Sequence, residues 1–383
     1  MENIKIKSFG PIQEADITFG DLTFFVGPQA SGKSILLQML KLISDKTTVE
    51  TRLENYGYVW GNIEEDNLER FFGEGMADVW NKRTKIEVDG KEYKKNFLLP
   101  KKPGNNEEID ETIFYIPAQR VLCLNYGWPR FFTDFEASVP YVLRDFSETL
   151  RFYLEAGFTH SESPVFPQSP NRINGLLTDS FNESIFYNGK VTVDSQAKKR
   201  LKLNINGLDL PFMTWSTGQK EFMPLLMGIY FLLSSKKIHR PGIDTVIIEE
   251  PEMGLHPEAI KSFILQIIAL LTLGYKVIVS THSPVLLEFA WAFNMLKAAQ
   301  ASDETLLELF NLEKNEKNEA LVEGVLSDKT IKTYYFQNTD FKVNVKDISS
   351  LDAGNEDLAI AEWGGLSSFA SKASEIVSLI AAK

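Results

Sequence analysis

The stretch Gly27-Pro28-Gln29-Ala30-Ser31-Gly32-Lys33-Ser34 decides the fold class of this chain of 383 residues. It fits the pattern G-x-x-x-x-G-K-[ST] without a mismatch. Glycine lets such a loop wrap closely, so that successive backbone N–H groups point at phosphate oxygens. Lys33 supplies a point charge, Ser34 can ligate Mg²⁺, and the helix that starts at Lys33 adds the positive end of its dipole. The stretch therefore predicts a phosphate-binding loop.

The residues around this loop have the periodicity that a phosphate site needs. Residues 22–26, LTFFV, form a continuous apolar run, as expected for a strand that is buried on both faces. After Lys33 the apolar residues recur at helical spacing. From about residue 211 strand and helix patterns alternate again, with strands expected at Thr245–Ile248 and Val277–Ser280 and helices at Pro257–Leu271 and Pro284–Leu296. The predicted fold class is α/β.

We expect this α/β fold to be built from two separated segments, residues 1–45 and 211–383, with residues 46–210 inserted between them. The inserted region is predicted to mix helices with β-hairpins, because turn pairs flanked by alternating residues occur at Asp89-Gly90, Asn188-Gly189 and Asn206-Gly207. It shows no sustained heptads, so we expect no long coiled-coil arm. In the tail we expect a solvated loop at residues 313–318.

Composition and charge exclude several classes of protein. Lys and Arg number 40 and Asp and Glu number 52, which gives a net charge of −12 and argues against a wholly basic nucleic-acid coat. The longest nearly uncharged apolar run, residues 222–233, is too short to cross a bilayer, so we expect no membrane segment and a soluble, cytoplasmic protein. The single cysteine, Cys123, cannot form an intrachain disulfide and is expected to be a small buried side chain.

A second candidate element is an apolar strand that ends in the acids Glu249 and Glu250. Nucleotide hydrolases place carboxylates beside the metal at such a strand end. Adjacent residues of a strand point to opposite sides, so the two acids cannot share one role. One of them can hold Mg²⁺ through water while the other faces the attacking water.

Two further turns carry candidate residues. His282 follows the strand predicted at 277–280, where a histidine can reach a γ-phosphate as a donor or position a water. His256 stands before Pro257, where starting a helix is at least as good an interpretation. Ser216-Thr217-Gly218-Gln219 precedes an apolar helix, and its serine, glycine and N–H groups make either a second anion site or an ordinary helix cap.

With these four elements in this order, the chain resembles ABC-type ATPases of the soluble, non-transporter branch. It is most similar to the OLD, RecF and SMC-like group, and within it to the stand-alone bacterial AAA-15 and AAA-21 ATPases. By motif the resemblance covers residues 1–45 and 211–300, and it covers the tail more loosely. It implies a P-loop ABC-type ATPase head, with a mixed α/β insertion between the Walker A loop and the signature motif.

The resemblance implies a role for each motif. Ser216, Thr217, Gly218 and Gln219 stand for the signature, which completes the nucleotide site of a second protomer. Glu250 corresponds to the catalytic base, His282 to the switch histidine and Glu249 to the Walker B acid. Relatives carry an aspartate at the Walker B position and often Ser-Gly-Gly-Gln as the signature, so these two departures lead us to expect slow turnover.

The resemblance also points to residues between the motifs. Relatives carry a Tyr-hydrophobic-Pro-Ala-x-Arg segment, which is here Tyr115-Ile-Pro-Ala-Gln-Arg120. Gln119 is then the candidate Q-loop glutamine, so that Mg²⁺ would be held by Ser34, Gln119 and Glu249. Lys7 and Phe9 of the first strands are candidates for contacting adenine.

The leading hypothesis from this resemblance is a switch ATPase that binds and hydrolyses ATP with Mg²⁺. Two protomers would form a homodimer that sandwiches two ATP molecules in composite sites, and the dimer would control a separate effector protein, with a role in phage defence. A transporter subunit is disfavoured by the long separation between Ser34 and Ser216. A nuclease domain is disfavoured because residues 300–383 are short and contain no Asp-x-Asp pair.

Two alternatives stay open. One is a DNA-binding repair or recombination ATPase of the RecF kind, and the other is a nucleotide-bound scaffold that hardly hydrolyses ATP. Clusters of cations that could line a phosphate-binding face are Lys94-Lys95, Lys101-Lys102, Lys198-Lys199-Arg200 and Lys236-Lys237. The same clusters are also interpreted as solvated lysines of turns and loops, in keeping with the net charge of −12.

Overall fold

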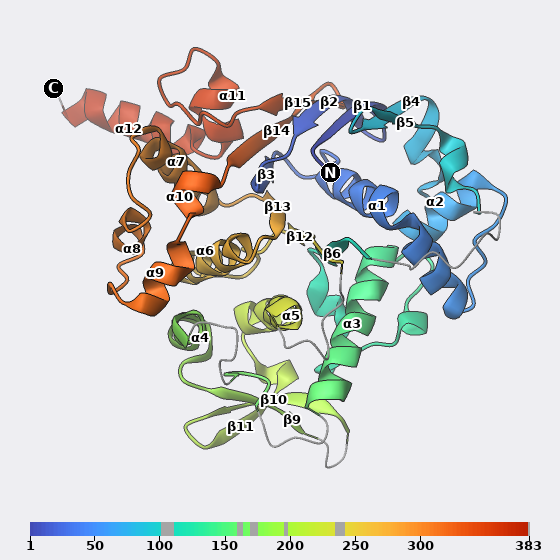
Figure 1. The fold of residues 1–383 in the computed structure, drawn as a ribbon, viewed down its shortest axis with the longest axis horizontal. Coiled ribbons are helices and arrows are strands. Elements are labelled where there is room, and N and C mark those ends of the chain that lie inside the picture. The colour runs from blue at the N-terminus through green and yellow to red at the C-terminus, as the bar shows by residue number, and fades with distance from the viewer. Residues whose placement is uncertain (101–110, 159–163, 169–174, 195–197, 234–241, 382–383) are drawn as a thin grey trace.

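The computed structural model describes residues 1–383 except 101–110, 159–163, 169–174, 195–197, 234–241 and 382–383 (Figure 1). Its centre is a ten-stranded mixed sheet with the strand order β5-β4-β1-β2-β15-β14-β3-β13-β12-β6. The strands are β1 (Asn3–Phe9), β2 (Ile12–Thr18), β3 (Leu22–Val26), β4 (Trp80–Val88), β5 (Lys91–Tyr93), β6 (Ile113–Ile116), β12 (Thr245–Glu249), β13 (Lys276–Thr281), β14 (Ile331–Thr339) and β15 (Lys342–Asp347). The predicted α/β fold class is confirmed.

At β3 both faces of the sheet are covered by helices, which explains why all five residues of this strand are buried. Leu22, Phe24 and Val26 belong to one hydrophobic cluster and Phe25 to the other. The first cluster includes side chains of α5 (Thr217–Leu233), α6 (Pro257–Thr272), α7 (Pro284–Ala298) and most of α3 (Tyr141–Gly157), and the second those of α1 (Lys33–Asn55) and α2 (Glu64–Phe72). A strand that is covered on both faces has no solvent side, so its side chains are apolar apart from Thr23, whose buried hydroxyl accepts the Gly20 N–H at 3.0 Å.

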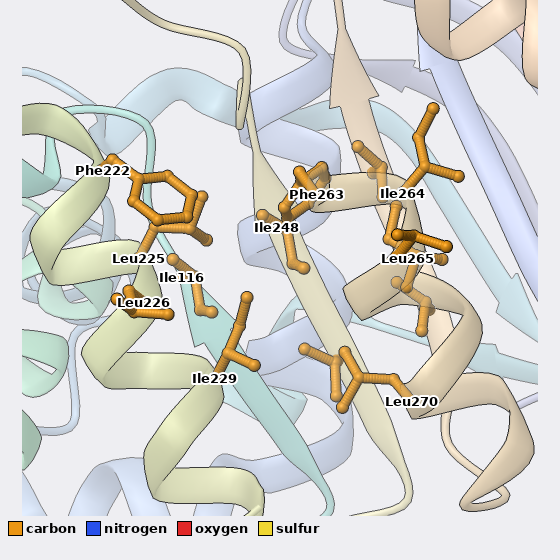
Figure 2. Close-up of a cluster of buried hydrophobic side chains, with 14 of the residues drawn as sticks. Ile116, Phe222, Leu225, Leu226, Ile229, Ile248, Phe263, Ile264, Leu265 and Leu270 are labelled. Atoms are coloured by element: carbon orange, nitrogen blue, oxygen red, sulfur yellow. The ribbon is translucent and has the colours of Figure 1, made fainter. Parts of the chain in front are cut away.

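The packing between α5 and the sheet is shown in Figure 2. Phe222, Leu225 and Ile229 project from α5 toward Ile116 of β6 and Ile248 of β12. Phe263 of α6 joins the cluster, and all of these side chains are at most 1% exposed. The helix that begins at Thr217 is therefore fixed to the two strands that lead into Gln119 and Glu249.

The strand register brings the ends of four parallel strands to one edge of the sheet. Ile248 pairs with Ile116, Glu249 with Ser280, and Thr281 with Val26. The residues that follow these strands therefore emerge side by side. Ligands bind at this carboxyl edge of open α/β sheets.

The middle region is divided between two sheets. Its strands β4, β5 and β6 belong to the ten-stranded sheet, where β6 pairs with β12. Its later strands β9 (Lys190–Asp194), β10 (Arg200–Ile205) and β11 (Leu208–Pro211) form a separate three-stranded sheet, drawn below α5 in Figure 1. A two-stranded hairpin, β7 (Leu124–Asn125) and β8 (Trp128–Pro129), completes the strands.

Two of the three predicted hairpins are confirmed. Asp89-Gly90 joins β4 to β5, and Asn206-Gly207 joins β10 to β11. The third prediction, at Asn188-Gly189, is wrong, because this pair closes a helical segment, η5 (Asn182–Phe186), and leads into β9. The backbone N–H of Asn188 donates to the carbonyl oxygen of Asn182 at 3.0 Å, so the turn belongs to the helix end.

The strands and helices predicted from residue 245 to 296 are confirmed, with small differences at their ends. The loop predicted at residues 313–318 is wrong in part, because the Asn315 side chain accepts hydrogen bonds from the N–H groups of Lys317 and Asn318 and so starts a helix. The remaining helices are α4 (Gly175–Phe181), α8 (Thr305–Leu309), α9 (Glu316–Val322), α10 (Val325–Asp328), α11 (Leu358–Ala361) and α12 (Ser368–Ala381). Among the described residues, no helix combines the length and apolar character needed to span a membrane.

Candidate functional site

The phosphate loop lies between β3 and α1, as predicted. Gly27 and Gly32 have φ angles of 148° and 88°, which favour glycine, and a Cβ on Gly32 would lie 2.8 Å from Pro11 Cγ. The Lys33 ammonium is folded into the loop, where it donates to the carbonyl oxygens of Gly27 at 2.8 Å and Pro28 at 2.9 Å. Burial lowers the pKa of Lys33 to about 8, although nearby acids, Glu250 first among them, act in the opposite direction.

Glu249 ends β12 with its side chain buried beside the start of α1. Burial raises the pKa of Glu249, while hydrogen bonds from the Ser34 hydroxyl and the Ala118 N–H favour the charged form. The Ala118 nitrogen lies 3.4 Å from Glu249 Oε2, and Oε1 has no hydrogen-bond partner among the described residues. A buried carboxylate oxygen without a partner is costly, and a cation would satisfy it.

Glu250 follows the last residue of β12 and lies beside His282. Its Oε1 is 3.5 Å from His282 Nε2, and its backbone has a φ of 42°, which turns the chain at the end of the strand. The neighbouring His282 side chain is the main cause that lowers the pKa of Glu250, so its carboxylate is ionised at neutral pH. The two acids thus have different contacts, Glu249 with Ala118 and Glu250 with His282.

Ser34, Gln119 and Glu249 line one cavity of about 200 Å³ at the carboxyl edge of the sheet. Gln38 lines it as well, and its buried Oε1 has no hydrogen-bond partner among the described residues. The sequence analysis missed Gln38, although its position one helical turn after Ser34 places both side chains on one face of α1.

The oxygen atoms around this cavity suit Mg²⁺, which prefers oxygen ligands and usually keeps several waters. They come from the Ser34 hydroxyl, the Glu249 carboxylate and the glutamine amides. Within the described part of the chain, no group of three or more His, Cys, Asp or Glu side chains is placed to hold a metal by itself. An ion here would therefore depend on water and phosphate oxygens to complete its coordination.

Glu252 is a site residue that the sequence analysis did not identify. The residue is half-buried, and Oε1 accepts hydrogen bonds from the Thr281 hydroxyl at 2.8 Å and the His282 N–H at 2.5 Å. Burial raises the pKa of Glu252. These bonds tie the turn after β12 to the turn that carries His282.

Arg120 is a second residue whose role the sequence analysis did not predict. The sequence places it only at the end of the Tyr-hydrophobic-Pro-Ala-x-Arg segment. It is fully buried, and burial lowers the pKa of Arg120. Its guanidinium donates to the carbonyl oxygens of Glu221 and Glu249, both at 3.0 Å, and of Glu250 and Pro251, both at 3.3 Å. Arg120 therefore links the start of α5 to the end of β12, and it does so from the position next to Gln119.

The segment Ser216–Gln219 is a capped helix start that lies apart from the phosphate loop of its own chain. The Ser216 N–H donates to Gln219 Oε1 at 3.0 Å, and the Gln219 side-chain nitrogen donates to the carbonyl oxygen of Ile185 at 3.0 Å. Gly218 packs against Gly254, since a Cβ on Gly218 would lie 2.6 Å from the Gly254 carbonyl oxygen. No contact recorded for the described residues joins this segment to the phosphate loop.

Packing, ion pairing or helix capping accounts for the positions of four other candidate residues. Phe9 is fully buried against Phe72 and Trp80, so its suggestion as an adenine contact is wrong, and Lys7 lies on the surface beside Glu14. His256 caps α6, with Nδ1 accepting the Glu258 N–H at 3.3 Å. Cys123 is buried, as predicted.

Two family models match the chain in adjacent parts. A family described as "AAA ATPase domain" matches residues 1–115, which include the phosphate loop. A family described as "AAA domain, putative AbiEii toxin, Type IV TA system" matches residues 142–288, which include the signature, both acids and His282. Neither match covers residues 116–141, where Gln119 and Arg120 lie.

Relatives match shorter segments. The Old nuclease of Escherichia phage P2 is 39% identical over 61 residues, 16% of this chain and 10% of that protein. The DNA replication and repair protein RecF of Leptospira biflexa is 30% identical over 104 residues, 25% of this chain and 28% of that protein. This chain thus spans less than a third of the length of either relative. A solved SMC head bound to the C-winged helix domain of ScpA shares 12% identity and a TM-score of 0.41, over 90% of this chain and 96% of that one.

The family matches and the phosphate-site geometry concern the same residues. The strand-loop-helix with Lys33 lies in the first matched span, and Glu249, Glu250 and His282 lie in the second. The two relatives that match shorter segments of the chain are an Old nuclease and a RecF protein. The chain is thus similar to AAA ATPase domains over two spans, and its likeness to the Old nuclease and RecF is confined to short segments.

Proposed function

We propose that this ATPase binds ATP with Mg²⁺ and hydrolyses it slowly, as a switch that works in a homodimer with ATP between the protomers. The observation that carries the proposal is the cavity lined by Ser34, Gln119 and Glu249, with the Glu250–His282 pair at the next residues of the same strand ends. A hydroxyl, an amide, a buried acid, a half-buried acid and a histidine at one sheet edge are the groups that ATP hydrolysis requires.

The residues divide into those that bind and those that act on water. The backbone N–H groups of Gly27 and of residues 29–34, together with the Lys33 ammonium, bind the phosphates, and Ser34, Gln119 and Glu249 hold Mg²⁺. Bound there, the ion would neutralise charge on the phosphate oxygens.

Glu250 is the proposed general base. The water oxygen forms a bond to the γ-phosphorus while the bond from that phosphorus to the ADP oxygen breaks, and the water proton goes to a Glu250 carboxylate oxygen. The ionised state of Glu250 supports this role, because only the carboxylate accepts the proton. His282 Nε2, which lies 3.5 Å from Glu250 Oε1, has one proton, with which it either positions this carboxylate or donates to a γ-phosphate oxygen.

The signature is proposed to act on the nucleotide of a second protomer. Ser216 and Thr217 are exposed at the start of α5, whose seventeen residues give this end a positive dipole. The Ser216 N–H already donates to Gln219 Oε1, whereas the hydroxyls of Ser216 and Thr217 lie at the exposed helix end, where they can donate to an anion brought by another chain. This supports two composite sites in a symmetric dimer.

Control of a separate effector and a role in phage defence are further parts of the proposal. They are supported by the toxin named in one family description and by the phage origin of the Old nuclease. The RecF-like alternative rests on basic clusters. Two of them, Lys101-Lys102 and Lys236-Lys237, lie outside the described residues. The histidines His160 and His239 lie outside them as well. In the described clusters, Lys95 pairs with Glu65, and only residues 198–200 gather at a cleft.

The test is the mass of Glu250→Gln with and without Mg-ATP, measured by light scattering together with turnover. We expect lost turnover and an ATP-dependent shift from monomer to dimer, because the variant binds ATP and does not remove it. Glu323→Gln, which changes an exposed acid, is the matched control and should turn over normally. Normal turnover by Glu250→Gln, with no ATP-stabilised dimer, would refute the mechanism.

A mixing experiment separates composite sites from sites within one chain. Thr217→Glu places a charge opposite the partner's phosphates, and an acid is tolerated at a helix N-terminus, so the fold should persist. Thr217→Gln is the neutral control. Lys33→Ala and Thr217→Glu should each be inactive alone, while their mixture should recover part of the wild-type turnover. No recovery from a mixture that forms heterodimers would contradict the composite site.

A further inference from the structure

A cleft of about 710 Å³ lies away from the phosphate site, on the side of the three-stranded sheet. One wall is the β7–β8 hairpin and the residues that follow it to Asp134. The other wall is formed by Lys198–Arg200, where β10 begins, and by residues 211–214 after β11. The hairpin lies between the spans of the two family matches, so it belongs to neither.

The charges that line the cleft are mostly positive. Four cations, Arg130 and Lys198–Arg200, face one acid, Asp134, in a chain whose net charge is −12. Part of this charge is paired, since Lys199 lies 3.7 Å from Glu155 and Arg200 lies 3.1 Å from Asp194. Lys198 is exposed and has no ion pair among the described residues. The cleft therefore favours an anionic ligand.

Apolar and aromatic surface lies among these cations. Tyr126 is 71% exposed at the hairpin tip, Phe131 is 52% exposed and Met213 is 56% exposed. Tyrosine, methionine and arginine are the residues that mark protein-binding surfaces. Exposed side chains of this size need an apolar partner group to bury them.

The cations that lie over the aromatic rings of the cleft favour a peptide ligand over a nucleic acid. Lys199 lies over the ring of Trp128 at 5.5 Å, and Arg151 lies over the ring of Phe131 at 5.0 Å. A base needs an open ring face on which to stack. Of the rings of Tyr126, Trp128 and Phe131, the last two already have a cation on one face. An acidic side chain of a ligand can pair with that cation without needing the ring face.

Both walls of the cleft continue directly into residues of the ATP site. The hairpin follows Gln119 and Arg120 through one short helix, η3 (Arg120–Cys123), and residues 211–214 lead into Ser216. The walls are joined where Leu201 N–H donates to the Gly127 carbonyl oxygen at 2.8 Å. They also meet tightly at Gly127, since a Cβ there would lie 2.5 Å from Phe212 Cβ.

We propose that this cleft binds an acidic peptide segment of a partner protein, with an apolar side chain of the segment packed between Tyr126 and Met213. Because the walls lead to Gln119 and Ser216, occupancy of the cleft changes ATP turnover. This second part rests on the proposed ATPase function, and the binding itself does not.

The experiment is selection from a displayed library of random dodecapeptides with the full chain in the absence of nucleotide. We expect the selected sequences to combine an excess of Asp and Glu with an aromatic or aliphatic residue. A selected peptide should bind about tenfold or more weakly to Lys198→Gln/Lys199→Gln and to Tyr126→Ala, measured by fluorescence polarisation. Binding that is lost in the first variant should also depend on salt.

Matched variants separate the cleft from general charge. Lys82→Gln/Lys85→Gln removes the same charge from exposed positions of β4 and should leave binding within about twofold. Tyr126→Phe keeps the ring and should bind as the wild type does. Selection of peptides without acidic residues, or equal binding by all variants, would overturn the proposal.

Two competitors and one activity assay complete the test. Displacement of the peptide by a 12-nucleotide oligothymidylate would overturn the peptide assignment in favour of nucleic acid. The peptide should change ATP turnover of the wild type and not that of Lys198→Gln/Lys199→Gln. Peptide binding without any ATPase activity of the wild type would show that the proposed function failed while the binding site stood.

Discussion

Glu252 and His282 are joined by a hydrogen bond in which Glu252 Oε1 accepts the His282 backbone N–H at 2.5 Å. The same oxygen accepts the Thr281 hydroxyl, so one carboxylate sets the position of the turn that carries the histidine. The position of His282 beside Glu250 thus depends on a third acid, two residues further along the chain.

Glu252→Ala should destabilise the fold by about 1–3 kcal/mol, because two buried donors lose their acceptor. It should also lower turnover, since the His282 turn is no longer held. Glu252→Gln retains an acceptor oxygen and is the control, with near-normal turnover expected. Urea unfolding and ATPase assays measure both effects. Unchanged stability in Glu252→Ala would show that the turn is held by other contacts.

Arg120→Met should destabilise the protein by on the order of 3 kcal/mol, because several buried carbonyl oxygens lose their donor together. Turnover should fall as well, since the guanidinium holds Glu249 and Glu250 relative to α5. Arg83→Met removes an exposed arginine of β4 and should change neither quantity. The measurements are denaturant unfolding and turnover. If the two variants behave alike, the role of Arg120 is refuted.

The phosphate-loop lysine should make nucleotide binding depend on pH near pH 8. The pKa of Lys33 is about 8 in the folded chain, so its charge is lost as the pH rises through this value, and the affinity for a non-hydrolysable ATP analogue should fall. The unfolded chain has the higher pKa, near 10.5, and binds more protons between the two values. The free protein should therefore gain stability from pH 8 to 10.5.

Both the fall in nucleotide affinity and the gain in stability should be absent in Lys33→Met. Any pH dependence that this variant retains comes from other titrating groups, so it serves as the reference. Calorimetric titrations and thermal unfolding across the range give the comparison. An affinity that stays level to pH 10 in the wild type would contradict the lowered pKa of Lys33.

Gly218→Ala should destabilise the protein by about 1–3 kcal/mol through overpacking. The added Cβ would lie 2.6 Å from the backbone oxygen of Gly254, which has no flexible atoms to yield. Gly61→Ala is the matched control, because its nearest neighbour is the end of the Arg70 side chain at 3.8 Å. Thermal unfolding tests the difference, and equal melting temperatures would mean that the two glycine segments separate easily.

Gln38→Ala and Gln119→Ala should each raise the Mg²⁺ concentration needed for half-maximal turnover, by roughly tenfold. Both amides line the cavity with Ser34 and Glu249, and the buried Gln38 oxygen has no partner among the described residues. Gln337→Ala, on the exposed end of β14, should leave the Mg²⁺ dependence unchanged. A metal titration of turnover decides which amide contributes, and no change in either variant would remove both from the metal site.

The sequence by itself determined the parts of the protein that consist of neighbouring residues. The phosphate loop, the strand ending in Glu249 and Glu250, the helix after Pro257 and the hairpin turns at Asp89 and Asn206 all follow from local spacing and turn chemistry. Local patterns suffice here because the chemistry of each motif lies within one strand, one turn or one helix start.

Only the tertiary structure decided which distant segments meet. The pairing of β6 with β12 places the middle region in the main sheet and sets Gln119 beside Glu249. Burial of Arg120 and Glu252 depends on carbonyls and hydroxyls from other elements, and a charged side chain in a sequence looks the same whether it is solvated or buried. The cleft likewise exists only because the hairpin folds against β10, more than sixty residues away. Such contacts depend on the packing of the whole chain, which has no periodic signal in any one segment.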